Sequence, residues 1–164
     1  MNNMLEVRDL KVAFPKEEPG SKLVDWAVKG ISFSMGRGEI LAIIGESGSG
    51  KSMTALSIAG LLPPDAVSSG EILFNKKDLM ALSKEGRRMV QGKDISMIFQ
   101  EPMTSLNPVM KIGKQIEEVL VLHTGLSKAE RKERVCKALL DAGLADPERL
   151  CQSYPHQLSG GMRQ

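Results

Sequence analysis

A glycine-rich run between an apolar segment and a predicted helix constrains the fold more than any other feature of this chain. The run is Gly45-Glu46-Ser47-Gly48-Ser49-Gly50-Lys51-Ser52, which matches the pattern G-x-x-x-x-G-K-[ST]. Residues 39–44 before it are apolar after Glu39 and do not alternate with polar ones, which predicts a strand covered on both faces of a parallel sheet. Residues 51–59 after it favour a helix that ends at Gly60. This order predicts an α/β fold.

The same run carries the groups that a bound phosphate requires. Its glycines let backbone N–H groups point inward, and the following helix adds the positive end of its dipole. Lys51 is expected to reach the β and γ phosphates, and the Ser52 hydroxyl is expected to bind Mg²⁺. We therefore expect all eight residues to bind a nucleotide with Mg²⁺. The pattern alone does not distinguish kinases, GTPases, helicases and transport ATPases.

Composition excludes several other classes of protein. The chain has 164 residues, a net charge of +2 and 41% hydrophobic residues, so neither disorder nor a nucleic-acid coat fits. Cys136 and Cys151 are the only cysteines, which favours reduced thiols in a cytosolic protein. The longest apolar run, residues 40–44, is far too short for a membrane helix. His123 and His156 have no partners at metal-ligand spacing, so both are interpreted as structural or surface residues.

Strand patterns dominate the first hundred residues. Apolar residues alternate over 5–14 and 31–35, which predicts half-buried strands joined by a surface connection over residues 15–21. Two further strands are expected over 70–74 and 95–99. The basic segment 83–93 between them is interpreted as a solvated helix face, with phosphate or lipid headgroups as the alternative.

Beyond Pro108 the pattern of apolar residues changes from strand spacing to helical spacing. Apolar residues recur at helical spacing over 112–123, and Ser127 with Glu130 predicts the start of a second helix. Asp146-Pro147 predicts the start of a third. We therefore expect two domains, a nucleotide-binding core with a β subdomain at residues 1–100 and a helical subdomain at residues 101–164.

Two further motifs identify a family resemblance. Leu158-Ser159-Gly160-Gly161-Met162-Arg163-Gln164 resembles the LSGGQ signature of the ABC ATPases, with Met162 in place of the first Gln. Tyr154-Pro155-His156-Gln157 is similar to its usual lead-in, and Ser96 to Gln100 is similar to the strand and glutamine of the family's Q-loop. The Ser-Gly-Gly turn is also consistent with a helix start that binds phosphate, or with a plain linker.

The resemblance implies roles for individual residues. Gln100 would hold Mg²⁺ and the attacking water, and would act with Lys51 in catalysis. Ser159, Gly160 and Gly161 would close over the nucleotide of an opposing subunit. Phe14 would stack on the adenine, with Trp26 as a competing candidate and a core position as the alternative for Phe14.

A longer stretch resembles one branch of this family. Gln100-Glu101-Pro102-Met103-Thr104-Ser105-Leu106-Asn107-Pro108 is similar to ATP-binding subunits of dipeptide, oligopeptide and nickel importers. There it faces the membrane permease, and a stiff exposed loop here would present Met103 and Leu106 to a partner helix. The resemblance implies an ATPase on the cytoplasmic face of the inner membrane, paired with a second ATP-binding subunit and not with nucleic acid.

The resemblance also implies parts that lie beyond Gln164. In this family the Walker B strand with its Asp, the catalytic Glu and the switch His all follow the signature, so no residue here receives the general-base role. Two alternatives remain open: a nucleotide-binding fragment without turnover, whose strands 41–44 and 95–99 lack neighbours, and an ABC ATPase without a permease. The transported solute and whether the dimer is homo- or heteromeric are not predicted.

Overall fold

The computed structural model describes residues 3–15, 24–100 and 105–164. The predicted connection over residues 15–21 lies almost wholly outside these ranges. The chain forms two compact units, residues 1–91 and 92–164. The domain boundary predicted after residue 100 lies inside the second unit and stays a prediction.

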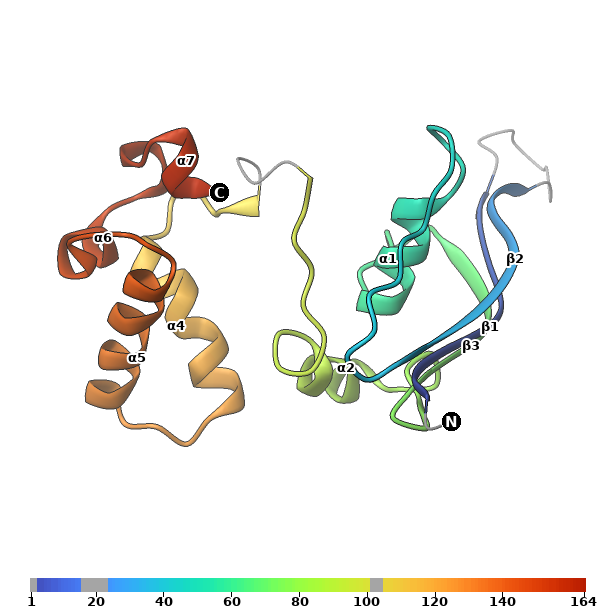
Figure 1. Cartoon of the computed structure of the whole chain (residues 1–164), viewed down its shortest axis with the longest axis horizontal. Coiled ribbons are helices and arrows are strands. Elements are labelled where there is room, and N and C mark those ends of the chain that lie inside the picture. The colour runs from blue at the N-terminus through green and yellow to red at the C-terminus, as the bar shows by residue number, and fades with distance from the viewer. Residues whose placement is uncertain (1–2, 16–23, 101–104) are drawn as a thin grey trace. The chain divides into compact units, whose positions relative to one another are not determined.

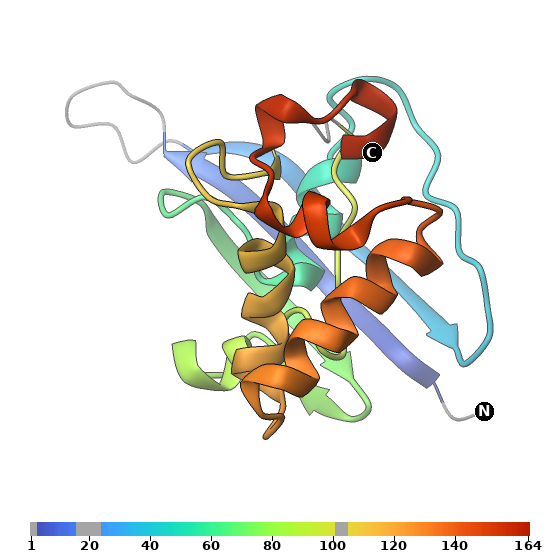
Figure 2. The same cartoon turned by 90° about the vertical axis from the view of Figure 1, so that its left-hand side faces the viewer.

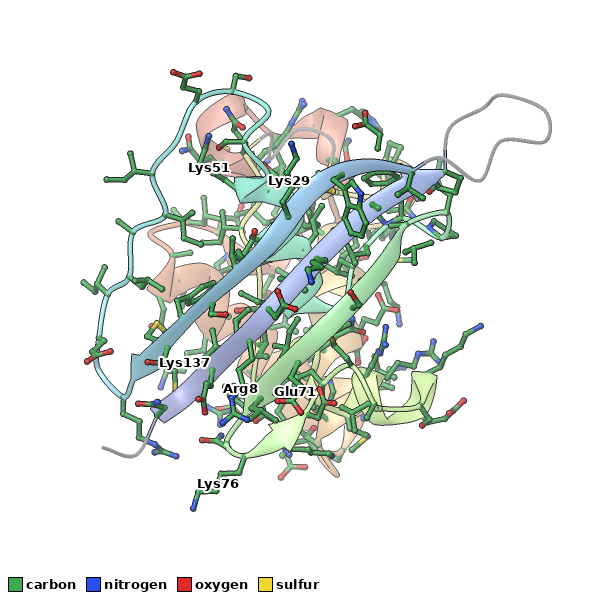
Figure 3. The ribbon with its side chains drawn as sticks, turned by 90° about the vertical axis from the view of Figure 1, so that its right-hand side faces the viewer. Arg8, Lys29, Lys51, Glu71, Lys76 and Lys137 are labelled. Atoms are coloured by element: carbon green, nitrogen blue, oxygen red, sulfur yellow. The ribbon has the colours of Figure 1, made fainter. Side chains whose placement is uncertain are left out.

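The first unit is built on an antiparallel sheet. Its strands are β1 (Asn3–Pro15), β2 (Val24–Gly36), β3 (Val67–Phe74) and β4 (Lys77–Asp78), in the order β2-β1-β3-β4. Val7 pairs with Phe33 on one side and with Ile72 on the other. An ion pair between Arg8 Nη1 and Glu71 Oε2, at 3.1 Å, crosses from β1 to β3 (Figure 3). The strands predicted from alternating residues are confirmed.

A bulge interrupts the pairing of β1 with both neighbours. Asp9 has a φ of 44°, and the register of β1 against β3 shifts between Arg8 and Lys11. Opposite it, Gly70 has a φ of 109°, and a Cβ there would lie 2.5 Å from the Asp9 carbonyl oxygen. Gly70 is therefore required both by its backbone conformation and by the close approach of β1.

Two helices belong to the first unit. Helix α1 (Lys51–Ala59) contacts β1 and β2 (Figure 1). Leu10, Val12 and Ile72 are among the largest fully buried side chains of this unit. Helix α1 ends at Gly60, as predicted. Helix α2 (Lys84–Val90) follows, and its basic residues are largely exposed, in agreement with a solvated helix face.

Two predicted strands are not formed. Residues 39–44 have no strand partner among the described residues, and Ile40 and Ile44 are 99% and 93% exposed. Residues 95–99 form no strand either: Ile95 makes an isolated bridge to Gln91, and Ile98 is 96% exposed. Both strand predictions are wrong for this chain, because a strand exists only where another strand accepts its hydrogen bonds.

The second unit is helical (Figure 2). Helices α4 (Ile112–His123), α5 (Lys128–Asp141) and α6 (Pro147–Gln152) contact one another, and η1 (Pro155–Gln157) and α7 (Gly160–Arg163) follow. Their shared core comprises Ile112, Val135, Leu139, Leu150, Cys151 and Leu158. Among the described helices of both units, none combines the length and the apolar composition needed to cross a bilayer.

The start signals predicted for two of these helices are confirmed. Ser127 and Glu130 form a capping box at α5: the Ser127 side chain accepts from the Glu130 N–H, and the Glu130 carboxylate accepts from the Ser127 N–H at 2.7 Å. Asp146 caps α6 by accepting from the Arg149 N–H. These caps satisfy N–H groups that a helix start otherwise leaves without a partner.

Candidate functional site: a phosphate-binding loop

The glycine-rich run forms a loop that ends at the first residue of α1. Gly48 and Gly50 have φ values of 80° and 89°, in the left-handed region that glycine adopts without strain. Lys51 turns back over the loop, and its Nζ donates to the carbonyl oxygens of Gly45 and Glu46 at 2.8 and 2.6 Å. The ammonium therefore lies over the loop, next to the N-terminal end of α1 (Figure 3).

Gly50 fixes this loop to the sheet. A Cβ at Gly50 would overlap the carbonyl oxygen of Ala27 and would lie 3.1 Å from Val28 Cγ2, both on β2. The start of α1 thus lies closer to β2 than any residue with a side chain at position 50 would permit. The sheet sets where the loop ends and the helix begins.

The loop fits a bound polyphosphate with Mg²⁺. Helix α1 has no acidic residue in its first turn, so no carboxylate competes for the N–H groups at its start. Ser52, the second residue of the helix, is exposed, so its hydroxyl is open to a metal ion held between phosphates. The chemistry available is phosphate positioning and charge stabilisation.

The two aromatic candidates lie on neighbouring strands. Phe14 is half-buried near the end of β1 and pairs with Asp25, while Trp26 on β2 is 45% exposed and pairs with Ala13. Trp26 directly precedes Ala27, the residue whose carbonyl meets Gly50. Both aromatic side chains stay candidates for the adenine contact.

The other predicted site residues belong to the second unit. Gln100 is exposed and follows the extended residues 96–99. Ser159 is the N-cap of α7, and its Oγ accepts from the Met162 N–H at 3.4 Å. Gly160 and Gly161 are exposed, and a Cβ at either would meet nothing within 4 Å. The signature therefore does begin a short helix, with an unobstructed backbone surface.

The loop after Gln100 differs from its prediction. Glu101 to Thr104, including Met103, lie outside the described residues. Leu106 is half-buried and packs on the helical core, and its contact with a partner stays a prediction. Nothing in the sequence indicated this packing against the helical core. Val109 is instead the exposed apolar residue, at 82%.

Gln115 organises this loop, a role that the sequence did not reveal. Its Oε1 accepts from the Asn107 N–H at 2.9 Å, and its Nε2 donates to the carbonyl oxygens of Asn107 and Met110 at 3.0 and 2.8 Å. Asn107 Oδ1 also accepts from the Val109 N–H at 3.1 Å. The only feature of the sequence that pointed to this role is an amide side chain next to the apolar stripe of α4. Such a side chain is too common to be a specific signal.

Comparison with known proteins decides the family. Residues 28–164 match the family described as ABC transporter. The chain belongs to this family. It is 51% identical over 98% of its length to the peptidoglycan transport ATP-binding protein YejF of Agrobacterium fabrum, and 48% identical over its whole length to the oligopeptide transport ATP-binding protein OppD of Bacillus subtilis.

A solved structure gives the same result for the fold of this ABC family member. A dimeric ATP-binding cassette in a post-hydrolysis state, bound to ADP and Pi, matches 98% of the chain with a TM-score of 0.80 and 25% identity. The chain covers 65% of that cassette, 29% of YejF and 45% of OppD. It therefore spans less than half of these two transport proteins, and the α/β fold class of the ABC ATPases is confirmed.

Proposed function

We propose that this chain is part of the ATP-binding subunit of an ABC importer that takes up peptides or a related small solute. The observation that carries the proposal is the loop of residues 45–52, with the Lys51 ammonium over it and Gly50 fixed against β2. The similarity to peptide-transport ATP-binding proteins supports the substrate class.

Each part of the site has a role in this proposal. Gly45, Glu46, Ser47, Gly48, Ser49, Gly50, Lys51 and Ser52 hold the phosphates of ATP. Lys51 leaves its carbonyl partners for the β and γ phosphates and stabilises the charge that develops there. Ser52 and Gln100 would hold Mg²⁺, which would neutralise phosphate charge. Phe14, with Trp26 as the competing candidate, stacks on the adenine.

The proposal includes two partners. Ser159, Gly160 and Gly161 close over the nucleotide of a second ATP-binding subunit, and the open backbone at both glycines supports this role. Residues 100–108 contact an integral membrane permease, so the subunit is peripheral and lies on the cytoplasmic face of the membrane.

Hydrolysis by the full-length protein tests the proposal. We expect Lys51→Ala to lower kcat by about 100-fold or more, because the ammonium that lies over the loop is removed. Lys84→Ala, which changes an exposed lysine at the start of α2, is the matched control and should hydrolyse ATP at the parental rate. Undiminished hydrolysis by Lys51→Ala would refute the assignment.

A second experiment separates an importer from an ABC ATPase without a permease. The full-length protein is expressed with its genomic neighbours and purified from detergent-solubilised membranes. An importer subunit brings down an integral membrane protein, whereas a soluble factor brings down none. The second result would exclude the transport proposal and leave ATP binding intact.

A further inference from the structure

The helical unit contains a groove that the proposed function does not use. It is lined by residues of α4, α5 and α6 and has a volume of about 790 Å³, a size typical of sites that hold small organic ligands. None of its lining residues belongs to the phosphate-binding loop, to residues 100–108 or to the signature. A ligand in this groove would therefore bind at a separate site.

The floor of the groove is apolar. Val135 on α5 and Cys151 on α6 line it and are buried members of the helical core. Gly113 on α4 also lines it, and a Cβ there would lie 2.8 Å from the Cβ of Cys151, so α4 and α6 approach closely at this point. The methyl group of Ala129 adds to the same lining. This floor suits the apolar body of a ligand.

The rim of the groove carries a net positive charge. Four of its lining residues are lysines and two are glutamates. The lysines are Lys111, Lys114, Lys128 and Lys132. Helix α4 begins at this rim with no acidic residue in its first turn, so the positive end of its dipole adds to the charge of the lysines. The rim therefore favours an anion.

The two glutamates leave part of this charge uncompensated. Glu117 lies 3.1 Å from Arg131 Nε and 3.3 Å from Lys114 Nζ, and hydrogen bonds from Arg131 and then from Lys114 lower its pKa. Two cations thus share one carboxylate. Glu148 lies 3.5 Å from Lys132 Nζ, and both side chains are largely exposed, where an ion pair is weak and easily exchanged for another partner.

The other two lysines of the rim have no carboxylate partner in the described part of the chain. Lys111 donates to the neutral amide oxygen of Gln152 at 2.8 Å and forms no ion pair there. Lys128, the first residue of α5, is exposed and forms no ion pair among the described residues either. Lys128 is therefore the ammonium group most open to an added anion.

We propose that this groove is a binding site for a small carboxylate with an unbranched apolar chain. The chain lies on the floor formed by Gly113, Val135 and Cys151, and the carboxylate accepts charge-assisted hydrogen bonds from the rim, with Lys128 as the principal donor. This inference does not depend on the proposed transport function.

Octanoate is the probe that tests the site. It is titrated into the 164-residue chain at low protein concentration, and binding is followed by ligand-observed NMR. We expect saturable binding that weakens as the salt concentration rises. 1-Octanol, which has the same chain without the charge, should bind about tenfold more weakly, because it loses the charge-assisted bond. Acetate, which has the charge without the chain, should not bind measurably.

Two matched pairs of variants on α5 locate the bound octanoate. Lys128→Gln should weaken binding about fivefold, whereas Lys137→Gln, at an exposed lysine outside the groove, should leave it unchanged. Ala129→Phe should fill the groove and abolish binding, whereas Ala138→Phe, at an exposed alanine outside the groove, should not. Far-ultraviolet circular dichroism confirms that each variant is folded.

Three outcomes would overturn the proposal. The first is 1-octanol binding as tightly as octanoate, which would assign binding to exposed apolar segments such as residues 40–44. The second is an equal effect, or no effect, of the variants inside and outside the groove. The third is binding of tetraglutamate at the groove without binding of octanoate, which would make the site one for acidic peptides.

Discussion

Gly50 shows how much one residue without a side chain contributes at the phosphate-binding loop. It combines a left-handed backbone with a contact to the Ala27 carbonyl of β2. The pattern G-x-x-x-x-G-K-[ST] required a glycine here because of the loop's own shape. The structure adds a second reason, the close approach to the sheet, which no local pattern could reveal because residues 27 and 50 are separated in sequence.

These two reasons can be measured separately with alanine. Gly48→Ala should cost about 1 kcal/mol of unfolding free energy, since its φ of 80° is strained for alanine but nothing lies within 4 Å of the added methyl. Gly50→Ala should cost about 3 kcal/mol and weaken nucleotide binding, because overpacking against β2 adds to the same strain. Urea denaturation checks the difference, and equal losses for the two variants would contradict it.

Capping residues explain why the ends of several helices could be predicted from the sequence. Gly60, the Ser127 and Glu130 pair and Asp146 each act within a few residues of the helix end that they define. Such signals are local, so the sequence contains them in full. Strands at 39–44 and 95–99 could not be predicted in the same way, because a strand depends on a distant partner that no local pattern specifies.

The capping box of α5 predicts a pH dependence. Hydrogen bonds from the Ser127 side chain, and then from its backbone N–H, lower the pKa of Glu130 below its ordinary value. A carboxylate with a lowered pKa favours the folded state above the pKa of the unfolded chain, and this contribution is lost as the pH falls through the folded value. Glu130→Gln should therefore reduce the loss of stability between about pH 5 and pH 3.

Urea unfolding at a series of pH values measures this effect. Glu118→Gln is the matched control, since it replaces the same kind of side chain at an exposed position of α4. The two variants should differ in their pH slope. If Glu130→Gln has the same slope as the parent chain, the capping box does not contribute through its charge.

The exposed apolar segments dominate the behaviour of the whole 164-residue molecule. Ile40, Ile44 and Ile98 are each more than 90% exposed, and their extended backbones have no strand partner among the described residues. Extended apolar segments with unpaired hydrogen-bonding groups favour pairing between chains. We expect the 164-residue chain to self-associate as its concentration rises.

Lysine at two of these positions tests the origin of the association. Ile40→Lys with Ile98→Lys should shift light scattering toward the monomer, whereas Val109→Lys, on an exposed turn held by Gln115, should change it little. Equal effects would mean that apolar exposure alone causes association. Amides of residues 41–44 and 95–99 should also exchange rapidly with solvent, and strong protection in a soluble monomer would contradict the structure.

Two hydrogen bonds connect the start of α4 to the end of α6. The Ile112 N–H donates to the Ser153 carbonyl at 2.9 Å, and Lys111 Nζ donates to Gln152 Oε1 at 2.8 Å. Lys111 follows the turn that Gln115 stabilises, and Ser153 begins the segment that leads to the signature. If the start of α4 moved without the end of α6, both hydrogen bonds would break and Ile112 would become exposed. We therefore expect the loop at residues 107–110 and the segment that leads to Ser159 to move together.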